Sequence, residues 1–252
     1  SLSFEDYKKE YLRSINNPED FWTEKASSIS WIKKFTKIRE SSFEKDISIK
    51  WFADGTLNVS SNCLDRHLED RGSKTAIIWE SDDPNISKKI TYRELYEEVC
   101  KFSNGLKSIG VKKGDRVTIY LPMIPEAAIA MLSCARLGAI HSVVFGGFAP
   151  ESLRNRLDDC SSSFIITANE GLRGGKKIPL LANVKEALKS YKKIKKNIIV
   201  KRTNSEDHFE NGNDVWYHEL ISNQSNKCEP VEQNAEDPLF ILYTSGSTGK
   251  PK

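Results

Sequence analysis

The stretch "RVTIYLPMIPEAAIAMLSCARLGAIHSVVF", residues 116–145, contains the pattern that decides the fold. Its first residues, "RVTIYLP", are typical of a buried strand. Pro125 fits the first turn of a helix that runs to Leu137, and Gly138 is placed to end that helix. The following "AIHSVVF" lacks polar alternation, which is expected for a strand of a parallel sheet covered on both faces. The stretch therefore predicts a strand, a helix and a second strand parallel to the first.

The same alternation continues on both sides of this unit. Thr91 and Glu94 form a capping-box pattern at the start of a helix, and Gly110 is placed to end it. The apolar stripe of that helix consists of Leu95, Val99, Phe102 and Leu106. Further strands are expected at "TAIIWE", "SFIIT", "NIIV" and "LFILY", and further helices near Pro150 and from Pro179 to Tyr191. This order predicts an α/β fold with a largely parallel, covered sheet and flanking helices.

Residues 1–70 differ from the rest of the chain. They mix aromatic and charged residues at roughly helical spacing and contain three of the five tryptophans, Trp22, Trp31 and Trp51. We expect a helical and irregular lid segment that packs its aromatic rings onto the main body. Residues 71–252 are expected to form part of one α/β domain, with a polar surface excursion at residues 203–237.

Composition narrows the class of protein. The chain has 252 residues, of which 38% are hydrophobic and 29% charged, with a net charge of +3. These values are ordinary for a soluble globular protein, and the charge is too small to indicate nucleic acid or membrane. The five cysteines are widely spaced without a CxxC pair, which argues against disulfides and zinc. The first thirty residues lack an apolar signal core, and charged or polar residues interrupt the longest apolar run. We expect a cytoplasmic protein without a dedicated metal site.

The end of the chain, "YTSGSTGKPK", is the first candidate for a ligand-binding loop. Ligands of open parallel sheets gather at the carboxyl ends of the strands, and this loop follows the apolar strand "LFILY", which would hold it rigidly. Its glycines allow backbone N–H groups to face an anion, and its hydroxyls and lysine add donors and charge. The candidate residues are Thr244, Ser245, Gly246, Ser247, Thr248, Gly249 and Lys250. The spacing is not that of a Walker loop, and a solvated tail is the alternative.

Two other loops follow predicted strands. In "NEGLRGGKKIPL", Arg173 and Lys176 flank Gly174 and Gly175, an arrangement that suits a phosphorylated ligand or simply a solvated turn. In "VVFGGFAPESLRNRL", Phe145 and Gly147 could hold a flat ring or a pantetheine arm, or the glycines could only permit a tight turn. His141 is expected to be a packed, hydrogen-bonded histidine of the sheet. The basic run at residues 185–202 indicates a solvated helix face, with nucleic-acid binding as the alternative.

The terminal loop resembles the phosphate-loop signature of the acyl-adenylate-forming superfamily. Further segments resemble the acetyl-CoA synthetase (acetate–CoA ligase) family, namely "INNPEDFW", "WFADGTLNVSSNCLDRHL", "VVFGGFAPESLRNRL" and "GLRGGKKIPL". The resemblance covers residues 4–252, which correspond to the first part of the large amino-terminal domain of that family. The family signature continues past Lys252, so the chain is expected to be cut inside that domain.

The resemblance implies a two-step reaction. Acetate and Mg-ATP give acetyl-adenylate and pyrophosphate, and CoA then takes the acetyl group while AMP leaves. The loop from Thr244 to Lys250 would hold the β- and γ-phosphates of ATP. The nucleotide end of CoA would be bound by Arg173, Gly174, Gly175 and Lys176, and Phe145 and Gly147 would lie near the same ligand. Lys176 is often Arg in relatives. Asn169 stands where many relatives have an acid, which we expect to loosen that loop.

The partners implied are therefore the small molecules acetate, ATP and CoA, with neither nucleic acid nor membrane. The residues that contact adenine and acetate in the family lie beyond Lys252, so these 252 residues alone are expected to be inactive and to self-associate through uncovered apolar surface. Three alternatives remain. The chain could belong to a ligase for propionate or another short acid, it could be a non-catalytic CoA- or nucleotide-binding module, or it could bind nucleic acid through residues 185–202.

Overall fold

The computed structural model describes residues 3–205 and 212–244. The chain divides into two compact units, which are described separately below. The larger unit contains Val59–Val231 and Pro238–Lys252, and the smaller contains Ser1–Asn58 and Glu232–Asp237. The boundary predicted from sequence lies at residue 70, so residues 59–70 fall in the larger unit.

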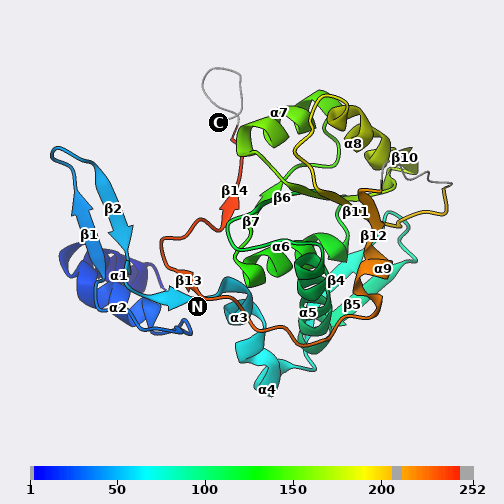
Figure 1. The fold of residues 1–252 in the computed structure, drawn as a ribbon. Helices are drawn as coiled ribbons and strands as arrows, with labels where there is room; N and C mark the ends of the chain where they lie inside the picture. Colours follow the sequence, from blue (N-terminus) through cyan, green and yellow to red (C-terminus); the bar gives the residue numbers. More distant parts are fainter. Residues whose placement is uncertain (1–2, 206–211, 245–252) are drawn as a thin grey trace. The chain divides into compact units, whose positions relative to one another are not determined.

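The larger unit is built on a six-stranded sheet with the order β12-β11-β8-β6-β7-β14, in which every neighbouring pair is parallel (Figure 1). The strands are β6 (Arg116–Tyr120), β7 (Ile140–Val143), β8 (Phe164–Ala168), β11 (Lys196–Val200), β12 (Asp214–Trp216) and β14 (Phe240–Ile241). This arrangement confirms the predicted parallel sheet.

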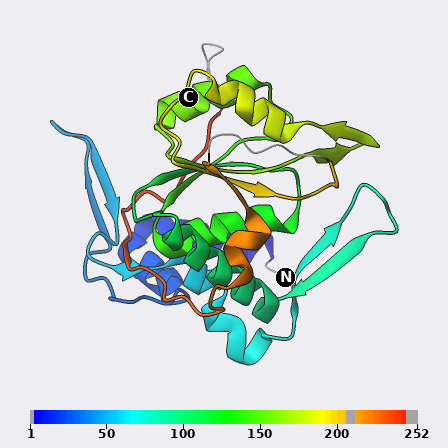
Figure 2. The ribbon, with the colours of Figure 1, turned by 45° about the vertical axis from the view of Figure 1, so that its right-hand side comes forward.

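Helices cover both faces of this sheet, as two views show (Figures 1 and 2). On one face lie α5 (Tyr92–Ser108), α6 (Pro125–Leu137) and α9 (Tyr217–Ser222), and on the other lie α7 (Pro150–Cys160) and α8 (Leu180–Leu188). All five residues of β8 are buried, which explains why the strand sequences lack polar alternation. Three short helical segments precede β4, namely α3 (Val59–Cys63), η1 (Asp65–His67) and α4 (Leu68–Arg71).

The local signals for helix ends are confirmed. The Thr91 hydroxyl accepts from the Glu94 N–H at 3.2 Å, and the Glu94 carboxylate accepts from the Thr91 N–H at 2.8 Å, so the capping box is complete. Gly110 and Gly138 follow α5 and α6 with φ of +93° and +70°, the left-handed conformation that favours glycine. The four apolar residues of the predicted α5 stripe are all buried.

Two predicted strands differ from expectation. The segment "TAIIWE" is a strand, β4 (Thr75–Glu80), but it pairs antiparallel with β5 (Ser87–Thr91) outside the six-stranded sheet. The short connection between β4 and β5 permits only an antiparallel pair, because parallel neighbours need a longer crossover. The segment "LFILY" gives only the two-residue β14, whose partner strand is β7. Phe240 of β14 is 48% exposed, so this strand is a weakly paired edge rather than a buried strand.

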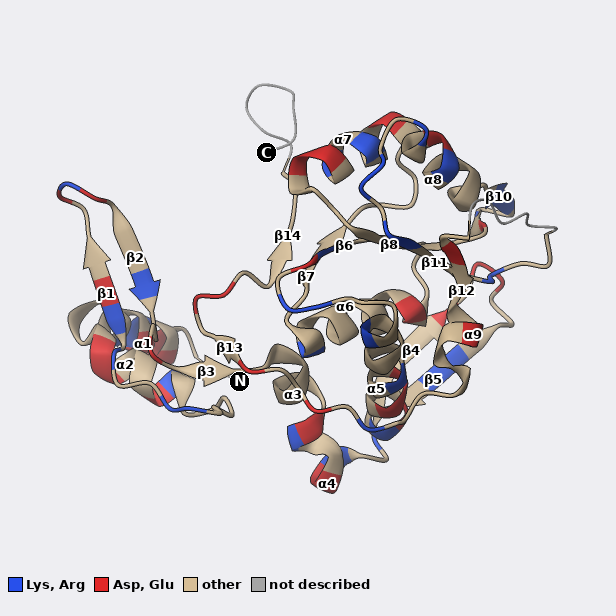
Figure 3. Cartoon of the chain, in the orientation of Figure 1, with Lys and Arg blue, Asp and Glu red and all other residues tan. Residues whose placement is uncertain are grey.

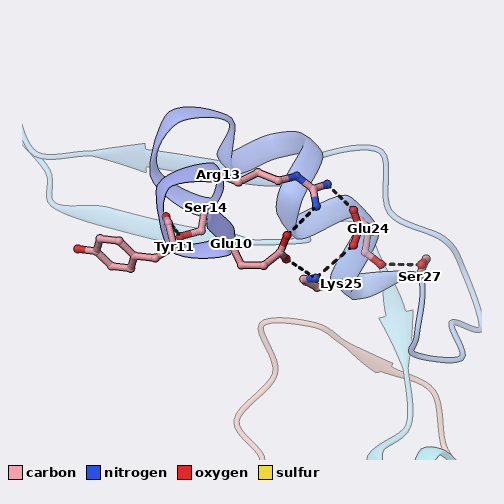
Figure 4. A network of polar contacts seen from close by, with 7 residues as sticks. All are labelled: Glu10, Tyr11, Arg13, Ser14, Glu24, Lys25 and Ser27. Atoms are coloured by element: carbon pink, nitrogen blue, oxygen red, sulfur yellow. Dashed lines mark hydrogen bonds and ion pairs between the residues drawn. The ribbon is translucent and has the colours of Figure 1, made fainter. Parts of the chain in front are cut away.

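The smaller unit contains two helices and short strands. Its elements are α1 (Phe4–Asn16), α2 (Pro18–Ala26), β1 (Arg39–Ser42), β2 (Ser48–Trp51), β3 (Thr56–Leu57) and β13 (Gln233–Asn234). Arg13 of α1 donates to Glu24 of α2, and Lys25 donates to Glu10 at 2.8 Å, so charged pairs join the two helices (Figure 4). The Trp22 and Trp51 rings lie 5.6 Å apart, and aromatic residues therefore pack within this unit itself.

Candidate functional site

A cavity of about 1070 Å³ lies in the larger unit, at the carboxyl ends of β6, β7 and β8. Its lining comes mostly from apolar residues of β4 and of the loops that follow the sheet strands. Among these residues are Trp79, Leu121, Met123, Phe145, Gly147, Arg173 and Tyr243. The size and apolar character are those of small-molecule sites, and the position is the one at which parallel sheets bind ligands.

The loop after β7 approaches neighbouring groups closely at both of its glycines. A Cβ added to Gly147 would lie 2.4 Å from a ring carbon of Phe145, and one added to Gly146 would lie 3.1 Å from the carbonyl oxygen of Leu121. Phe145 is 53% exposed, and its ring meets that of Phe148 edge to face at 5.6 Å. The structure thus places Phe145 and Gly147 in the cavity lining.

The segment Arg173–Lys176 forms the turn of a β-hairpin. β9 (Gly171–Arg173) pairs antiparallel with β10 (Lys176–Ile178), and Gly174 and Gly175 have φ of +56° and +73°. A two-residue turn with positive φ at both positions is the type that favours Gly-Gly. Arg173 lines the cavity, with its guanidinium carbon 5.5 Å from the centre of the Phe145 ring. Gly174, Gly175 and Lys176 are not among the lining residues found in the described ranges. Of the predicted CoA residues, the structure therefore brings together Phe145, Gly147 and Arg173.

Asn169 fixes the start of this hairpin loop rather than loosening it. Its side-chain oxygen accepts from the N–H groups of Arg202 at 2.8 Å and Glu170 at 2.9 Å. Its side-chain nitrogen donates to the Thr203 carbonyl at 2.9 Å. An aspartate could accept the first two hydrogen bonds but could not donate the third. The amide is therefore suited to this position, and the expectation of a looser loop is wrong.

The predicted phosphate loop is only partly within the described residues. Thr244 is described and exposed, whereas Ser245, Gly246, Ser247, Thr248, Gly249 and Lys250 lie outside the described residues. Tyr243, directly before the loop, lines the cavity and donates its hydroxyl hydrogen to Asp159 of α7 at 2.7 Å. Burial, followed by this hydrogen bond, raises the pKa of Tyr243 above its usual value, so the phenol stays a donor near neutral pH.

Sequence reasoning missed Tyr243, Arg156 and Asp159. Arg156 of α7 lines the cavity, and its guanidinium carbon lies 5.2 Å from the Tyr243 ring and 4.6 Å from the Phe148 ring. Asp159 and Tyr243 are 84 positions apart in the chain, and no spacing rule links them. The signal in the sequence is the tyrosine directly before the Gly-rich loop.

His141 is buried in β7, as predicted. Burial lowers its pKa to about 4, so the imidazole is neutral at neutral pH. Its ring lies 5.8 Å from that of Phe240. The predicted hydrogen bond is not seen at Nδ1, which has no partner among the residues described. The ring therefore acts as a packed, neutral group.

The basic run at residues 185–202 crosses α8 and reaches β11. Six of its eight Lys and Arg residues lie between residues 185 and 196, and buried residues such as Ala187 and Tyr191 lie among them. The basic positions of α8 are blue in Figure 3. Lys189 pairs with Glu186 at 2.6 Å. Within the described ranges, no helix is both long and apolar enough to cross a membrane.

Comparison with known proteins identifies relatives of the whole chain. A family model described as "AMP-binding enzyme" matches residues 64–252, and one described as "Acetyl-coenzyme A synthetase N-terminus" matches residues 7–63. The chain is 62% identical over 249 residues to acetyl-coenzyme A synthetase of Parvibaculum lavamentivorans, covering 98% of this chain and 38% of that protein. It is 56% identical over 251 residues to acetyl-coenzyme A synthetase of Yersinia pestis, with the same coverage.

A solved structure shows the same fold. Acetoacetyl-CoA synthetase from Streptomyces lividans superposes with a TM-score of 0.86 at 23% identity, covering 96% of this chain and 36% of that one. The chain thus spans little more than a third of the length of the relatives that it matches. Because the first model covers most of the sequence and the second covers nearly all of the remainder, the chain belongs to the AMP-binding enzyme family.

Proposed function

We propose that the chain works as the amino-terminal part of an acetate–CoA ligase. In this reaction acetate attacks the α-phosphate of ATP to give acetyl-adenylate and pyrophosphate, and the CoA thiol then takes the acetyl group and releases AMP. The names of the relatives support the proposal. The observation that carries it is the cavity, in which Phe145, Gly147 and Arg173 lie together with Tyr243 at the start of the phosphate-loop sequence.

Arg173 is the cation proposed for CoA binding. Its guanidinium is oriented over the Phe145 ring at the edge of the cavity, where it could pair with a phosphate of the nucleotide end. Lys176 is its partner across the hairpin and adds a second positive charge at the turn. Gly174 and Gly175 form that turn, and Phe145 and Gly147 are proposed to contact the flat or extended part of CoA.

The phosphate loop is proposed to hold ATP. This loop would donate hydrogen bonds to the β- and γ-phosphates and stabilise the charge of the departing pyrophosphate. Its residues are Thr244, Ser245, Gly246, Ser247, Thr248, Gly249 and Lys250. Magnesium usually accompanies such phosphates. In the part of the chain that the structure describes, no three metal-ligating side chains gather in one place, so we assign the ion to none of them. The cytoplasm is the proposed location.

The test separates the two half-reactions in a protein extended to the length of its relatives. We expect Arg173→Ala to slow thioester formation from acetyl-adenylate and CoA by about tenfold or more, because one charge-assisted phosphate contact is lost. Acetate-dependent exchange between ATP and pyrophosphate should be unchanged. The control is Arg154→Ala, which removes an exposed arginine of α7 that pairs only with Asp158 among the described residues. Equal loss of both half-reactions in Arg173→Ala would contradict the assignment.

Acetate is proposed as the acid by the relatives' names, and a ligase for propionate is the alternative. Pyrophosphate exchange with acetate and with propionate, measured in the same extended protein, distinguishes them. A CoA-binding module without catalysis is the second alternative, supported by the cavity alone. It predicts CoA binding that depends on Arg173 in a protein without pyrophosphate exchange.

A further inference from the structure

The start of the phosphate loop is poorly held by the strand that precedes it. β14 has two residues and pairs with β7 at two positions. Leu242, between β14 and Tyr243, is 61% exposed. The predicted apolar strand "LFILY" is thus present but short, and it gives the exit from the sheet few ladder contacts within the described residues. Within the described residues, a second element contacts the start of the loop.

Helix α7 makes the contacts that β14 lacks. The Tyr243 hydroxyl donates to the Asp159 carboxylate at 2.7 Å, a charge-assisted hydrogen bond. The Tyr243 ring also contacts the Arg156 guanidinium, with 5.2 Å between the guanidinium carbon and the ring centre. Arg156 in turn contacts the Phe148 ring and donates to the Ser152 carbonyl at 2.9 Å, within its own helix. Tyr243 is thus attached to α7 by both its polar and its aromatic part.

The helix that receives Tyr243 is a rigid support. Leu153 and Leu157 on the inner face of α7 are completely buried against the rest of the larger unit. Pro150 occupies the first turn, where its fixed φ favours the helix. The position of a residue that contacts α7 is therefore fixed by the packing of α7 on the hydrophobic core.

Asp159 lies where a negative charge is otherwise unfavourable. It belongs to the last turn of α7, and the negative end of the helix dipole repels an acid there. Asp158, next to it, is compensated by Arg154 at 3.2 Å. Asp159 forms no ion pair with any residue in the described ranges, and its carboxylate instead accepts from Tyr243. The placement indicates a role in holding the tyrosine rather than in stabilising the helix.

We propose that Asp159 and Arg156 are positioning residues for the phosphate loop, which fix Tyr243 on α7 and thereby fix the point at which the loop begins. This inference rests on the proposed function, because the proposed function makes ATP the ligand of the loop. Hydrogen-bond donors that stabilise a departing pyrophosphate are effective only when they are already oriented before the reaction. An error of about 1 Å at the first residue of the loop would reduce the rate about a hundredfold.

The experiment uses two substitutions in a protein extended to the length of its relatives. Tyr243→Phe keeps the ring over Arg156 and removes only the hydroxyl, whereas Asp159→Ala removes the acceptor. Both should reduce acetate-dependent pyrophosphate exchange by about tenfold or more. Amide hydrogen exchange in the peptide covering residues 243–250 should become faster in both.

The matched control is Asp158→Ala, which removes the neighbouring acid from the same helical turn with the same change of charge. It should change neither pyrophosphate exchange nor hydrogen exchange of residues 243–250. The proposal is overturned if Asp158→Ala has the same effect as Asp159→Ala, if Tyr243→Phe has none, or if both half-reactions and the melting temperature fall together.

Failure of the proposed function is separable from failure of this inference. If the unsubstituted protein shows no pyrophosphate exchange, the ligase proposal fails, and hydrogen exchange alone decides the positioning role. Faster exchange of residues 243–250 in Tyr243→Phe and Asp159→Ala, but not in Asp158→Ala, then supports it. Equal exchange rates in all four proteins overturn it.

Discussion

At the scale of single residues, His141 shows how burial sets a protonation state. The imidazole is 7% exposed in β7, and burial lowers its pKa to about 4. In the unfolded chain His141 binds a proton near pH 6.5, whereas in the folded chain it does so only near pH 4. Between these two values the unfolded state therefore binds more protons than the folded state. The contribution of His141 to folding stability is therefore fully present above about pH 6.5 and is lost as the pH falls toward 4.

This difference gives a prediction for urea unfolding. Between pH 7 and pH 5 the free energy of unfolding should fall by about 2 kcal/mol more in the natural sequence than in His141→Leu, which has no proton to bind. The control is His218→Gln, which replaces a histidine at an exposed position of α9. An unchanged pH dependence in His141→Leu would show that other groups cause the acid sensitivity.

The strand pattern and the family resemblance together predicted part of the candidate site. Phe145, Gly147 and Arg173 were found because each follows a recognisable buried strand, and parallel strands bring such loops to one edge. Tyr243 and Asp159 could not be found in this way, because their contact depends on how the exit of β14 meets the last turn of α7. The local sequence of neither residue contains that information.

At the scale of elements, a buried ion pair joins α6, η1 and the segment before β13. Arg136 of α6 is 1% exposed and donates two hydrogen bonds to the Asp65 carboxylate, each of 2.8 Å. Its Nε donates to the Cys228 carbonyl at 2.6 Å. A guanidinium buried this deeply needs its carboxylate, because removing one partner leaves an uncompensated charge.

We expect Asp65→Ala to lower the free energy of unfolding by about 3 kcal/mol, measured by urea denaturation. Asp70→Ala serves as the control, since it removes an exposed acid of the nearby α4 and should cost less than about 0.5 kcal/mol. Similar losses of unfolding free energy in the two variants would mean that the Asp65 carboxylate stabilises the fold no more than an exposed acid does.

The elements also show where sequence signals suffice. Helices α5, α6 and α7 begin and end close to their caps, prolines and glycines because these signals act within a few residues. The pairing of β4 with β5 and the shortness of β14 follow instead from which strands are neighbours in space. Apolar content indicated that these segments are strands, but it could not assign them to a sheet.

At the scale of the whole molecule, several of the apolar residues that line the cavity are exposed. Met123 is 87% exposed, Leu242 61% and Phe145 53%, and all three line the cavity. Apolar residues that are exposed together usually mark a surface that another protein segment covers. The 252-residue chain is therefore expected to self-associate.

Sedimentation velocity at increasing concentration should detect this association as a rising average mass. The double substitution of Met123→Gln and Leu242→Gln should weaken it, because it removes apolar surface at two points of the same patch. The comparison is Ile47→Gln with Phe43→Gln, which changes equally exposed residues of the smaller unit. A mass that is independent of concentration, or an equal effect of both pairs, would refute the assignment to this surface.

The route of the chain through the smaller unit has a consequence for biosynthesis. The short strand β13 pairs with β3, and the Trp51 N–H donates to Glu236 at 2.6 Å, so residues 232–237 complete a unit whose other residues precede position 59. During translation the first 58 residues leave the ribosome while their last strand has not yet been made. The smaller unit stays incomplete until the strands of the parallel sheet up to β12 have emerged from the ribosome. During that interval β3 lacks its partner strand, and a chaperone that protects nascent chains would bind the smaller unit at this edge.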